Sequence, residues 1–175
     1  MERKILYDGK FLTLWHEQGW EFVQRKNCSG IVVILAMTED KKVLFTEQYR
    51  IPLGKNVVEF PAGLVNDLAS EVDESFEEAA SRELLEETGY EAGRMEHLVT
   101  GPVSSGMCCE IIAFFRAHEL VRKSAGGGIG EFEQIRVHEV SLEDIPQWLD
   151  RVGRSGLLID PKVYAGLYWL HEGKK

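Results

Sequence analysis

The chain has 175 residues, of which 44% are hydrophobic, and a formal net charge of −9. This length fits one domain with a sizeable core, over residues 1–175. The acidic balance argues against nucleic acid as a partner, because neutralising phosphates needs a basic surface. No apolar run has the length of a membrane span, and MERKILYDGK at the start is too charged for a signal peptide. We therefore expect neither partner class, nucleic acid or membrane.

The three cysteines are Cys28, Cys108 and Cys109, and neither they nor the five histidines show the spacing of a metal site. An odd number of thiols is typical of the reducing cytoplasm, which is the location we expect. An acidic protein that binds a phosphorylated substrate needs local arginines, a cation, or both.

The first part of the chain has the composition of β-strands. Segments rich in β-branched and aromatic residues alternate with turn residues. The tract from Gly54 to Asn56 resembles a loop, and Pro61, Ala62 and Gly63 end the short strand that follows it. The predicted strands cover 11–17, 20–26, 30–38, 42–50 and 57–60.

The strongest helical pattern covers residues 75–88. Ser75 and Glu78 have the spacing of a capping box, which satisfies the first free amides of a helix. Gly89 then supplies a left-handed end. The apolar stripe that should face the core consists of Phe76, Ala80 and Leu84, widened by Ala79.

The remaining chain alternates strands and helices around a glycine-rich segment, SAGGGIGEFE. Pro161 suits the first turn of the last helix. Strands flanked by helices predict an α/β fold with layers around a mixed sheet. The predicted strands lie near 95–100, 111–118 and 134–140, and the predicted helices near 142–151 and 161–171.

Three glutamates gather on the central helix. Glu83 and Glu87 are four residues apart and share one face, with Glu86 close by. Like charges at this spacing weaken a helix, and its C-terminal end disfavours anions. A solvated acidic face is the simplest interpretation of such a run, but Arg82 can pair with Glu86 and a Pro-Ala-Gly turn precedes the helix. Hard oxygen ligands in this number suit Mg²⁺ or Mn²⁺.

RELLEETGY, residues 82–90, resembles the core of the Nudix box. Gly63 resembles the first glycine of the box, and Glu74 lies at the position of its outlying glutamate. Ten residues separate Gly63 from Glu74 where the family has five, so the loop is extended over 66–73. The resemblance implies a Nudix-type α/β/α sandwich around a mixed sheet, with an N-terminal antiparallel strand region.

The Nudix resemblance also implies roles for individual residues. Glu83 and Glu87 would bind the metal, together with the carbonyl of Ala62. Glu86 would assist or bridge through water, and Arg82 would orient the carboxylates, with Glu74 as its partner. Bound metals would neutralise a diphosphate and lower the pKa of an attacking water.

Two further segments resemble the ADP-ribose pyrophosphatases of this family, and with the N-terminal strands they extend the likeness over most of the chain. They are residues 47–64, EQYRIPLGKNVVEFPAGL, and residues 130–149, GEFEQIRVHEVSLEDIPQWL. In the second segment, Glu131 would be the catalytic base and Glu133 a metal ligand. Glu110 is an alternative base.

The same resemblance assigns substrate contacts. Arg50 would bind phosphate or the terminal ribose, since a guanidinium fork fits phosphate. Trp20, Glu21 and Arg25 lie in a strand similar to the adenosine-recognition strand, where the tryptophan would stack on adenine. Strand alternation puts Trp20 and Glu21 on opposite faces, so one of these two roles is open. Trp15 is a second candidate for stacking.

The expected function is metal-dependent hydrolysis of ADP-ribose or a related ADP-sugar to AMP and a sugar phosphate. A broader nucleoside-diphosphate-sugar hydrolase, acting also on GDP-mannose, is the alternative. A third hypothesis is a module that senses a nucleotide without cleaving it. We also expect a homodimer in which the strands of about residues 1–30 help to form the partner's substrate pocket, because strand edges need covering.

Overall fold

The computed structural model describes residues 2–66, 73–128 and 134–172. Their strands form three sheets, ordered β1-β2-β3, β10-β5-β6-β11 and β7-β4-β9-β8. Both four-stranded sheets are mixed, because β4 pairs with β9 in parallel and β6 pairs with β11 in parallel. The strands are β1 Lys4–Asp8, β2 Leu12–Glu17, β3 Trp20–Arg25, β4 Gly30–Ala36, β5 Lys42–Arg50, β6 Lys55–Glu59, β7 Ala62–Val65, β8 Tyr90–Pro102, β9 Ile111–Arg122, β10 Ile135–Ser141 and β11 Leu158–Ile159.

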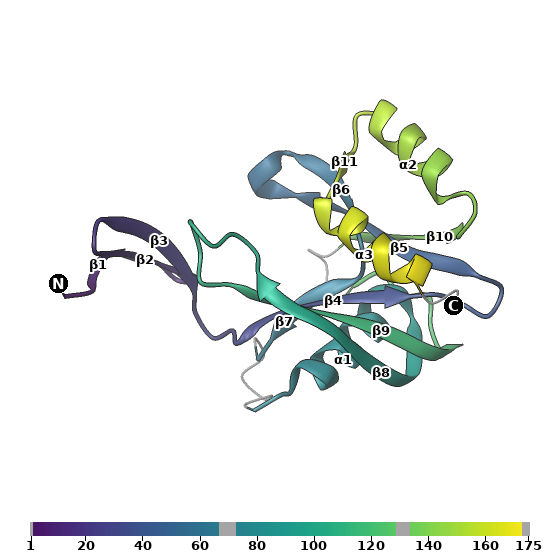
Figure 1. Ribbon diagram of the computed structural model, residues 1–175, viewed down its shortest axis with the longest axis horizontal. Coiled ribbons are helices and arrows are strands. Elements are labelled where there is room, and N and C mark those ends of the chain that lie inside the picture. Colours follow the sequence, from purple (N-terminus) through teal and green to yellow (C-terminus); the bar gives the residue numbers. More distant parts are fainter. Residues whose placement is uncertain (1, 67–72, 129–133, 173–175) are drawn as a thin grey trace.

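In the described part of the chain, three α-helices cover the two mixed sheets: α1 (Phe76–Thr88), α2 (Ile145–Arg154) and α3 (Pro161–Glu172). Helix α1 lies on one side of the body, and α2 and α3 lie on the other (Figure 1). The predicted α/β/α arrangement is therefore confirmed. Among the described helices, none is long and apolar enough to cross a bilayer.

Both faces of β4 are buried, which explains its unbroken apolar sequence. Alternate residues such as Val32 and Ile34 pack with the stripe of α1, where Ala79, Ala80 and Leu84 are buried as predicted. The residues between them, Val33 and Leu35, pack in a second cluster with α2, α3 and the other sheet. The central strand thus joins two cores.

The first sheet, β1-β2-β3, extends away from this body at the N-terminal end (Figure 1). Its join to the body is the segment before β9: Val23 N–H donates to the Met107 carbonyl at 2.9 Å, and Cys109 N–H donates to the Val23 carbonyl at 3.1 Å. This sheet carries many exposed large apolar side chains, among them Ile5, Leu6, Tyr7, Leu12 and Trp20.

The sequence-based prediction was wrong at the Pro61-Ala62-Gly63 tract. Instead of a turn alone, Ala62–Val65 forms strand β7, which pairs with β4 in the other sheet. Proline has no N–H to donate, and the Pro61 carbonyl accepts from Ile34 N–H at 2.8 Å. The chain therefore changes sheet here, and this change brings β7 beside α1.

Several predicted boundaries also moved, and β8 is longer than the strand predicted near 95–100. Helix α2 begins at Ile145 rather than Leu142, because Ser141 to Asp144 form a turn closed by Asp144 N–H to the Ser141 carbonyl. A 3-10 helix, Ile51–Leu53, precedes the expected Gly54–Asn56 loop, and β6 already begins at Lys55, within that loop. None of these shifts moves a predicted site residue out of its element.

Candidate active site

A cavity of about 350 Å³ lies between α1, β7 and the start of α3. Its lining residues come from eight helices and strands, from β3 near the N-terminus to α3 near the C-terminus. Its charged lining residues are Arg25, Arg50, Glu59, Glu83, Glu87 and Lys162.

One wall of the cavity is acidic and comes from α1. Gly63 makes room for it, because a Cβ at that position would lie 1.8 Å from Cδ of Glu83. The Ala62 N–H donates to Oε2 of Glu87 at 3.1 Å. The contact shown at Ala62 is thus made by its amide, and its carbonyl as a metal ligand stays a prediction. Glu83 and Glu87 line the same cavity, whereas Glu86 is not among its lining residues.

Arg82 connects the glutamates of the box. Its Nε donates to Glu74 at 2.8 Å, and its Nη1 lies 2.8 Å from Glu83 and 3.3 Å from Glu86. The hydrogen bond with Glu74, followed by the charge of Glu83, raises the pKa of the Arg82 guanidinium above its already high value. Arg82 therefore stays charged and fixes the carboxylates relative to one another.

Glu74 also closes the base of the extended loop. Its carboxylate accepts from Asn66 N–H at 3.1 Å, and its own N–H donates to Oδ1 of Asn66 at 2.7 Å. Asn66 and Glu74, which flank the extra residues, are thus hydrogen-bonded to each other. Residues 67–72 lie outside the described residues. Glu74 reaches Arg82 in spite of the longer spacing.

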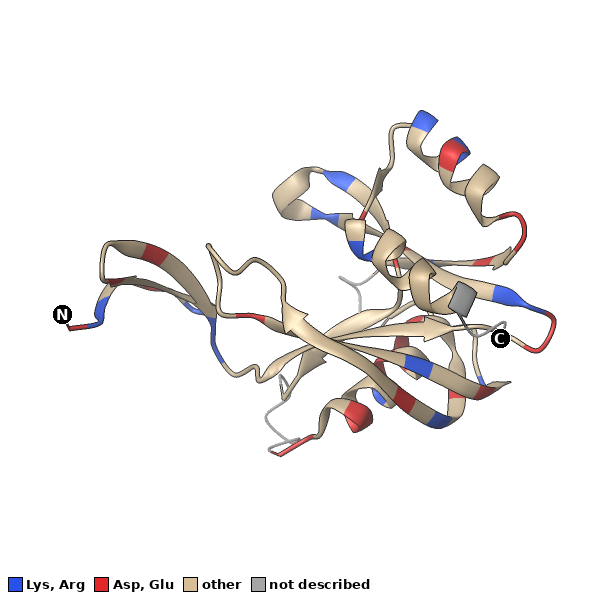
Figure 2. Ribbon diagram, in the orientation of Figure 1, with Lys and Arg blue, Asp and Glu red and all other residues tan. Residues whose placement is uncertain are grey.

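The cavity is also lined by basic side chains from other elements. Arg50, at the end of β5, contacts the carboxylate of Glu59 through Nε at 2.7 Å and Nη2 at 2.6 Å. Lys162, at the start of α3, pairs with Asp160. Figure 2 shows basic residues on the β5–β6 hairpin and at the start of α3, and acidic residues on α1. The cavity therefore has both carboxylates and basic groups in its lining, and Arg50 and Lys162 are each held by an acidic neighbour.

Glu59 and Lys162 were not predicted as site residues. Burial raises the pKa of Glu59, although its ion pair with Arg50 acts in the other direction. Both residues gave a weak sequence signal: Glu59 interrupts an apolar run, and Lys162 follows the proline that opens a helix. Their meeting with Arg50 depends on the pairing of β6 with β5 and of β11 with β6.

The acidic wall fits a hard divalent cation only as a partial ligand set. Within the described residues, no three histidine, cysteine or carboxylate side chains form a group that could hold a metal. Mg²⁺ commonly takes one or two carboxylates and completes its octahedron with water and substrate phosphate. Glu83 and Glu87 on one cavity wall match that requirement. Glu131 and Glu133, the other predicted base and ligand, lie outside the described residues.

The residues predicted to recognise adenosine do not line one common cavity. Trp20, which is 62% exposed, and Phe22 line a separate cavity of about 360 Å³ against Ser105 and Gly106. Glu21 is exposed but does not line that cavity, as strand alternation requires. The structure therefore does not bring Trp20 and Glu21 together within one chain.

Arg25 lines the cavity beside α1 and is held there by Glu110, whose Oε1 lies 2.8 Å from Nε of Arg25. Glu110 is thus occupied by an ion pair, which reduces its availability as a base. Trp15 is covered by the guanidinium of Arg3, 4.5 Å from the ring centre, and its Nε1 has no partner among the described residues.

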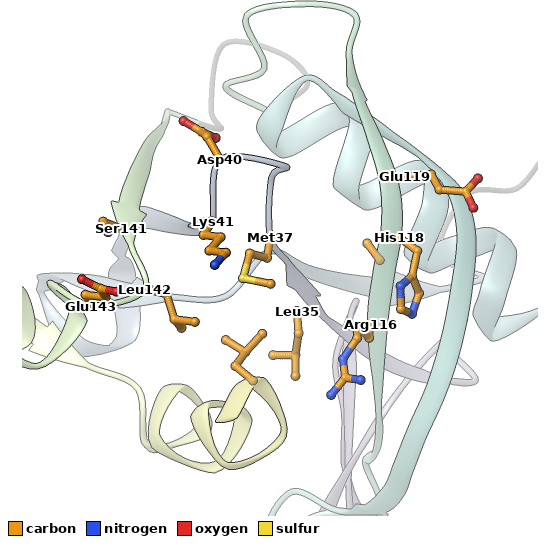
Figure 3. A pocket seen from close by; sticks show the side chains of 12 residues that line it. Leu35, Met37, Asp40, Lys41, Arg116, His118, Glu119, Ser141, Leu142 and Glu143 are labelled. Carbon is orange, nitrogen blue, oxygen red and sulfur yellow. The ribbon is translucent and has the colours of Figure 1, made fainter. Parts of the chain in front are cut away.

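A larger cavity, of about 710 Å³, lies near the C-terminal ends of β4 and β9 (Figure 3). Its floor is apolar, with Leu35, Leu142 and Leu170 among its lining residues. Met37 and Lys41 extend into it, whereas Glu119 points away. None of the box glutamates lines this space, so the smaller cavity is the candidate active site.

Comparison with known proteins shows the family to which the chain belongs. A family model for the NUDIX domain matches residues 27–157, so the chain belongs to this family and is a Nudix hydrolase. A solved "ADP compounds hydrolase" has the same fold, with a TM-score of 0.73 and 19% identity, covering 98% of this chain and 91% of that one.

Sequence relatives carry several names. The "Methanol dehydrogenase activator" of Bacillus methanolicus is 38% identical, covering 81% of this chain and 71% of that protein. The "ADP-ribose pyrophosphatase" of Bacillus subtilis is also 38% identical, covering 66% and 60%. The "GDP-mannose pyrophosphatase" of Pectobacterium atrosepticum is 30% identical, covering 99% and 96%.

Proposed function

We propose that the chain hydrolyses the diphosphate of ADP-ribose or a related ADP-sugar to AMP and a sugar phosphate. The observation that carries this proposal is one cavity lined both by Glu83 and Glu87 of α1 and by the basic residues Arg50 and Lys162. Carboxylates suit a cation, and guanidinium and ammonium groups suit phosphate oxygens. A diphosphate that binds together with a cation requires both kinds of group, carboxylates for the cation and basic groups for the phosphates.

Mg²⁺ is the proposed cofactor, with Mn²⁺ as the other candidate. When bound, the cation would neutralise the diphosphate and acidify the attacking water. Glu83 and Glu87 would hold it, joined by the Ala62 carbonyl and Glu133, and Glu86 would act through water. Arg82 would keep the carboxylates in place through the contacts described above.

The other residues would bind substrate and move the proton. Arg50 and Lys162 would fix the phosphates, and in-line displacement depends mainly on such positioning. Glu59 would orient Arg50 through their ion pair. Glu131 would accept the proton of the attacking water, because the helix glutamates are already committed to the cation and to Arg82.

We further propose that the adenosine end binds between two copies of the chain. Trp20 would stack on the base, and Glu21 of the second copy, with Arg25, would complete the site. The exposed apolar residues of the β1-β2-β3 sheet support a homodimer, since such surfaces usually mark an interface. Light scattering at micromolar concentration tests this: a mass near the monomer's 19.9 kDa would contradict it.

A broader nucleoside-diphosphate-sugar hydrolase is the second candidate. The relative named GDP-mannose pyrophosphatase matches nearly the whole of this chain, including the N-terminal strands. A non-catalytic nucleotide sensor is a weaker candidate, because the chain keeps Glu83, Glu86 and Glu87 with Arg82. The odd number of cysteines, all free, supports the cytoplasm as its location.

The decisive experiment is a substrate panel with Mg²⁺ or Mn²⁺ and identification of the products. It should contain ADP-ribose, GDP-mannose, other nucleotide sugars, dinucleotides and nucleoside triphosphates. We expect AMP and ribose phosphate from ADP-ribose at the highest kcat/KM. Preference for GDP-mannose would favour the second candidate, and binding without turnover would favour the sensor.

A further inference from the structure

The segment that follows β9, residues 123–128, lies against the C-terminal end of α1. The N–H of Gly127 donates to the Glu87 carbonyl at 2.8 Å, and the N–H of Gly128 donates to the Glu86 carbonyl at 3.1 Å. At the start of the segment, Lys123 N–H donates to the Gly89 carbonyl at 2.8 Å. These bonds are all between backbone groups, so they fix one backbone directly on another.

The two backbones approach so closely that side chains are excluded. A Cβ on Gly126 would lie 2.4 Å from the Thr88 carbonyl carbon and 2.7 Å from the Glu87 oxygen. A Cβ on Gly89 would lie 2.3 Å from the Ser124 oxygen. Both glycines also have positive φ, +69° and +76°. Contacts to backbone atoms cannot be relieved by turning a flexible side chain, so a methyl group would separate the segments.

This contact stabilises an unfavourable arrangement. The last carbonyls of a helix lack partners within the helix, and its C-terminal end repels negative charge. Glu86 and Glu87 are placed there. Donors from Gly127 and Gly128 satisfy those carbonyls, while Ala62 N–H holds the Glu87 side chain. Glu87 is therefore fixed at its backbone and at its carboxylate by two different elements.

We propose that residues 123–128 form a backbone clamp on the metal-binding turn, with Gly89 and Gly126 as positioning residues for Glu86 and Glu87. The clamp rests on the proposed function, because it presumes that these glutamates bind a cation. Its own prediction is narrower: loosening it should weaken cation binding and expose the amides of Gly127 and Gly128 to exchange.

The test compares Gly126→Ala with Gly156→Ala. Gly156 has a similar φ, +89°, but a Cβ there would meet nothing within 4 Å. Both variants carry the strain of a left-handed alanine, and only Gly126→Ala also opens the clamp. For Gly126→Ala we expect about tenfold weaker Mn²⁺ binding by calorimetry, a lower kcat, and faster hydrogen exchange at residues 127 and 128 in metal-free protein. Gly156→Ala should match the wild type in all three.

A milder variant covers the case in which Gly126→Ala does not fold. Ser124→Ala removes the acceptor of the Gly126 N–H, 3.3 Å away, and should speed exchange at residues 127 and 128 with a smaller loss of Mn²⁺ affinity. Folded Gly126→Ala with wild-type Mn²⁺ affinity would overturn the clamp, as would an equal loss in Gly156→Ala. Wild type that binds Mn²⁺ but cleaves no substrate would contradict the proposed function while leaving the affinity comparison valid.

Discussion

Helix α1 and the β1-β2-β3 sheet differ in how completely one chain determines them. Helix α1 has a capped start, a buried stripe, and hydrogen bonds from β7 and from residues 127 and 128 at its end. The N-terminal sheet has exposed apolar side chains, and Trp20 and Glu21 face different sides. The helix proposed for chemistry is thus held by contacts within one chain, whereas the residues proposed for base recognition are not brought together within it.

This difference separates two kinds of kinetic effect. Changes on α1 should reduce turnover for every substrate, because the cation and the phosphates are common to all nucleotide sugars. Changes on the N-terminal sheet should alter KM according to the base. Mutations in the two regions can therefore support or refute the division independently of one another.

The largest effect is expected for Glu87→Gln. The amide keeps the shape of the carboxylate but removes its charge, so cation affinity and kcat should both fall. Loss of several kcal/mol of metal assistance corresponds to a decrease in kcat of about 10³-fold. Single-turnover hydrolysis of ADP-ribose measures it, with Glu77→Gln on the exposed first turn of α1 as the matched control. Near-wild-type rates at saturating Mg²⁺ would contradict the assignment of Glu87.

A smaller loss is expected for Glu131→Gln. A general base typically contributes about 10²- to 10⁴-fold, and we expect the lower end because the cation still acidifies the water. Mg²⁺ affinity and KM should change little, whereas Glu133→Gln should also weaken cation binding. Glu110→Gln is the comparison, and it should retain most of the rate. If instead Glu110→Gln loses the rate and Glu131→Gln keeps it, Glu110 is the base.

Trp20→Ala tests the other side of the comparison. Stacking of a base on an aromatic ring is worth about 1–3 kcal/mol, so KM for ADP-ribose should rise roughly tenfold while kcat is nearly unchanged. Phe11→Ala removes another exposed aromatic near the same sheet and should change KM much less. A fall in kcat alone would show that Trp20 contributes to turnover, and it would contradict the proposed division between α1 and the N-terminal sheet.

The sequence predicted the elements whose signals are local. The stripe, the capping box and Gly89 of α1 all lie within 15 residues, and each is present in the structure. The sequence did not predict β7, because its pairing with β4 is a long-range contact and its composition resembles a turn. Glu59 and Lys162 were missed for the same reason: their place beside Arg50 depends on strand order. In the proposed homodimer, the contacts of Trp20 and Glu21 would depend further on a second chain.

Glu59→Gln should change how stability depends on pH. Because burial raises the pKa of Glu59 in the folded protein, the unfolded chain loses this proton first as pH rises above the ordinary value of 4.5. Wild-type stability therefore falls, through this group, between that value and the folded pKa. The substituted amide does not titrate. The stability of Glu59→Gln relative to wild type, measured as the difference in the free energy of unfolding, should therefore be greater at pH 7 than at pH 4. Denaturant titrations at both pH values measure this, and a shift in the opposite direction would show that the Arg50 pair dominates.

The smallest effect is expected at the start of α1, far from its metal-binding turn. Ser75 accepts from Glu78 N–H at 3.2 Å, and the Glu78 carboxylate accepts from Ser75 N–H at 2.8 Å. Loss of such a cap in Ser75→Ala destabilises a protein by about 1 kcal/mol, which for this length lowers Tm by roughly 2–4 °C. Ser81→Ala makes the same chemical change in the middle of the helix, where alanine is preferred, and should not lower Tm. Since Gly127, Gly128 and Ala62 hold the other end of α1, kcat should be unchanged in Ser75→Ala. A loss of kcat would show that fraying at Ser75 reaches Glu87, and that the helix is less firmly held by its C-terminal contacts than the geometry indicates.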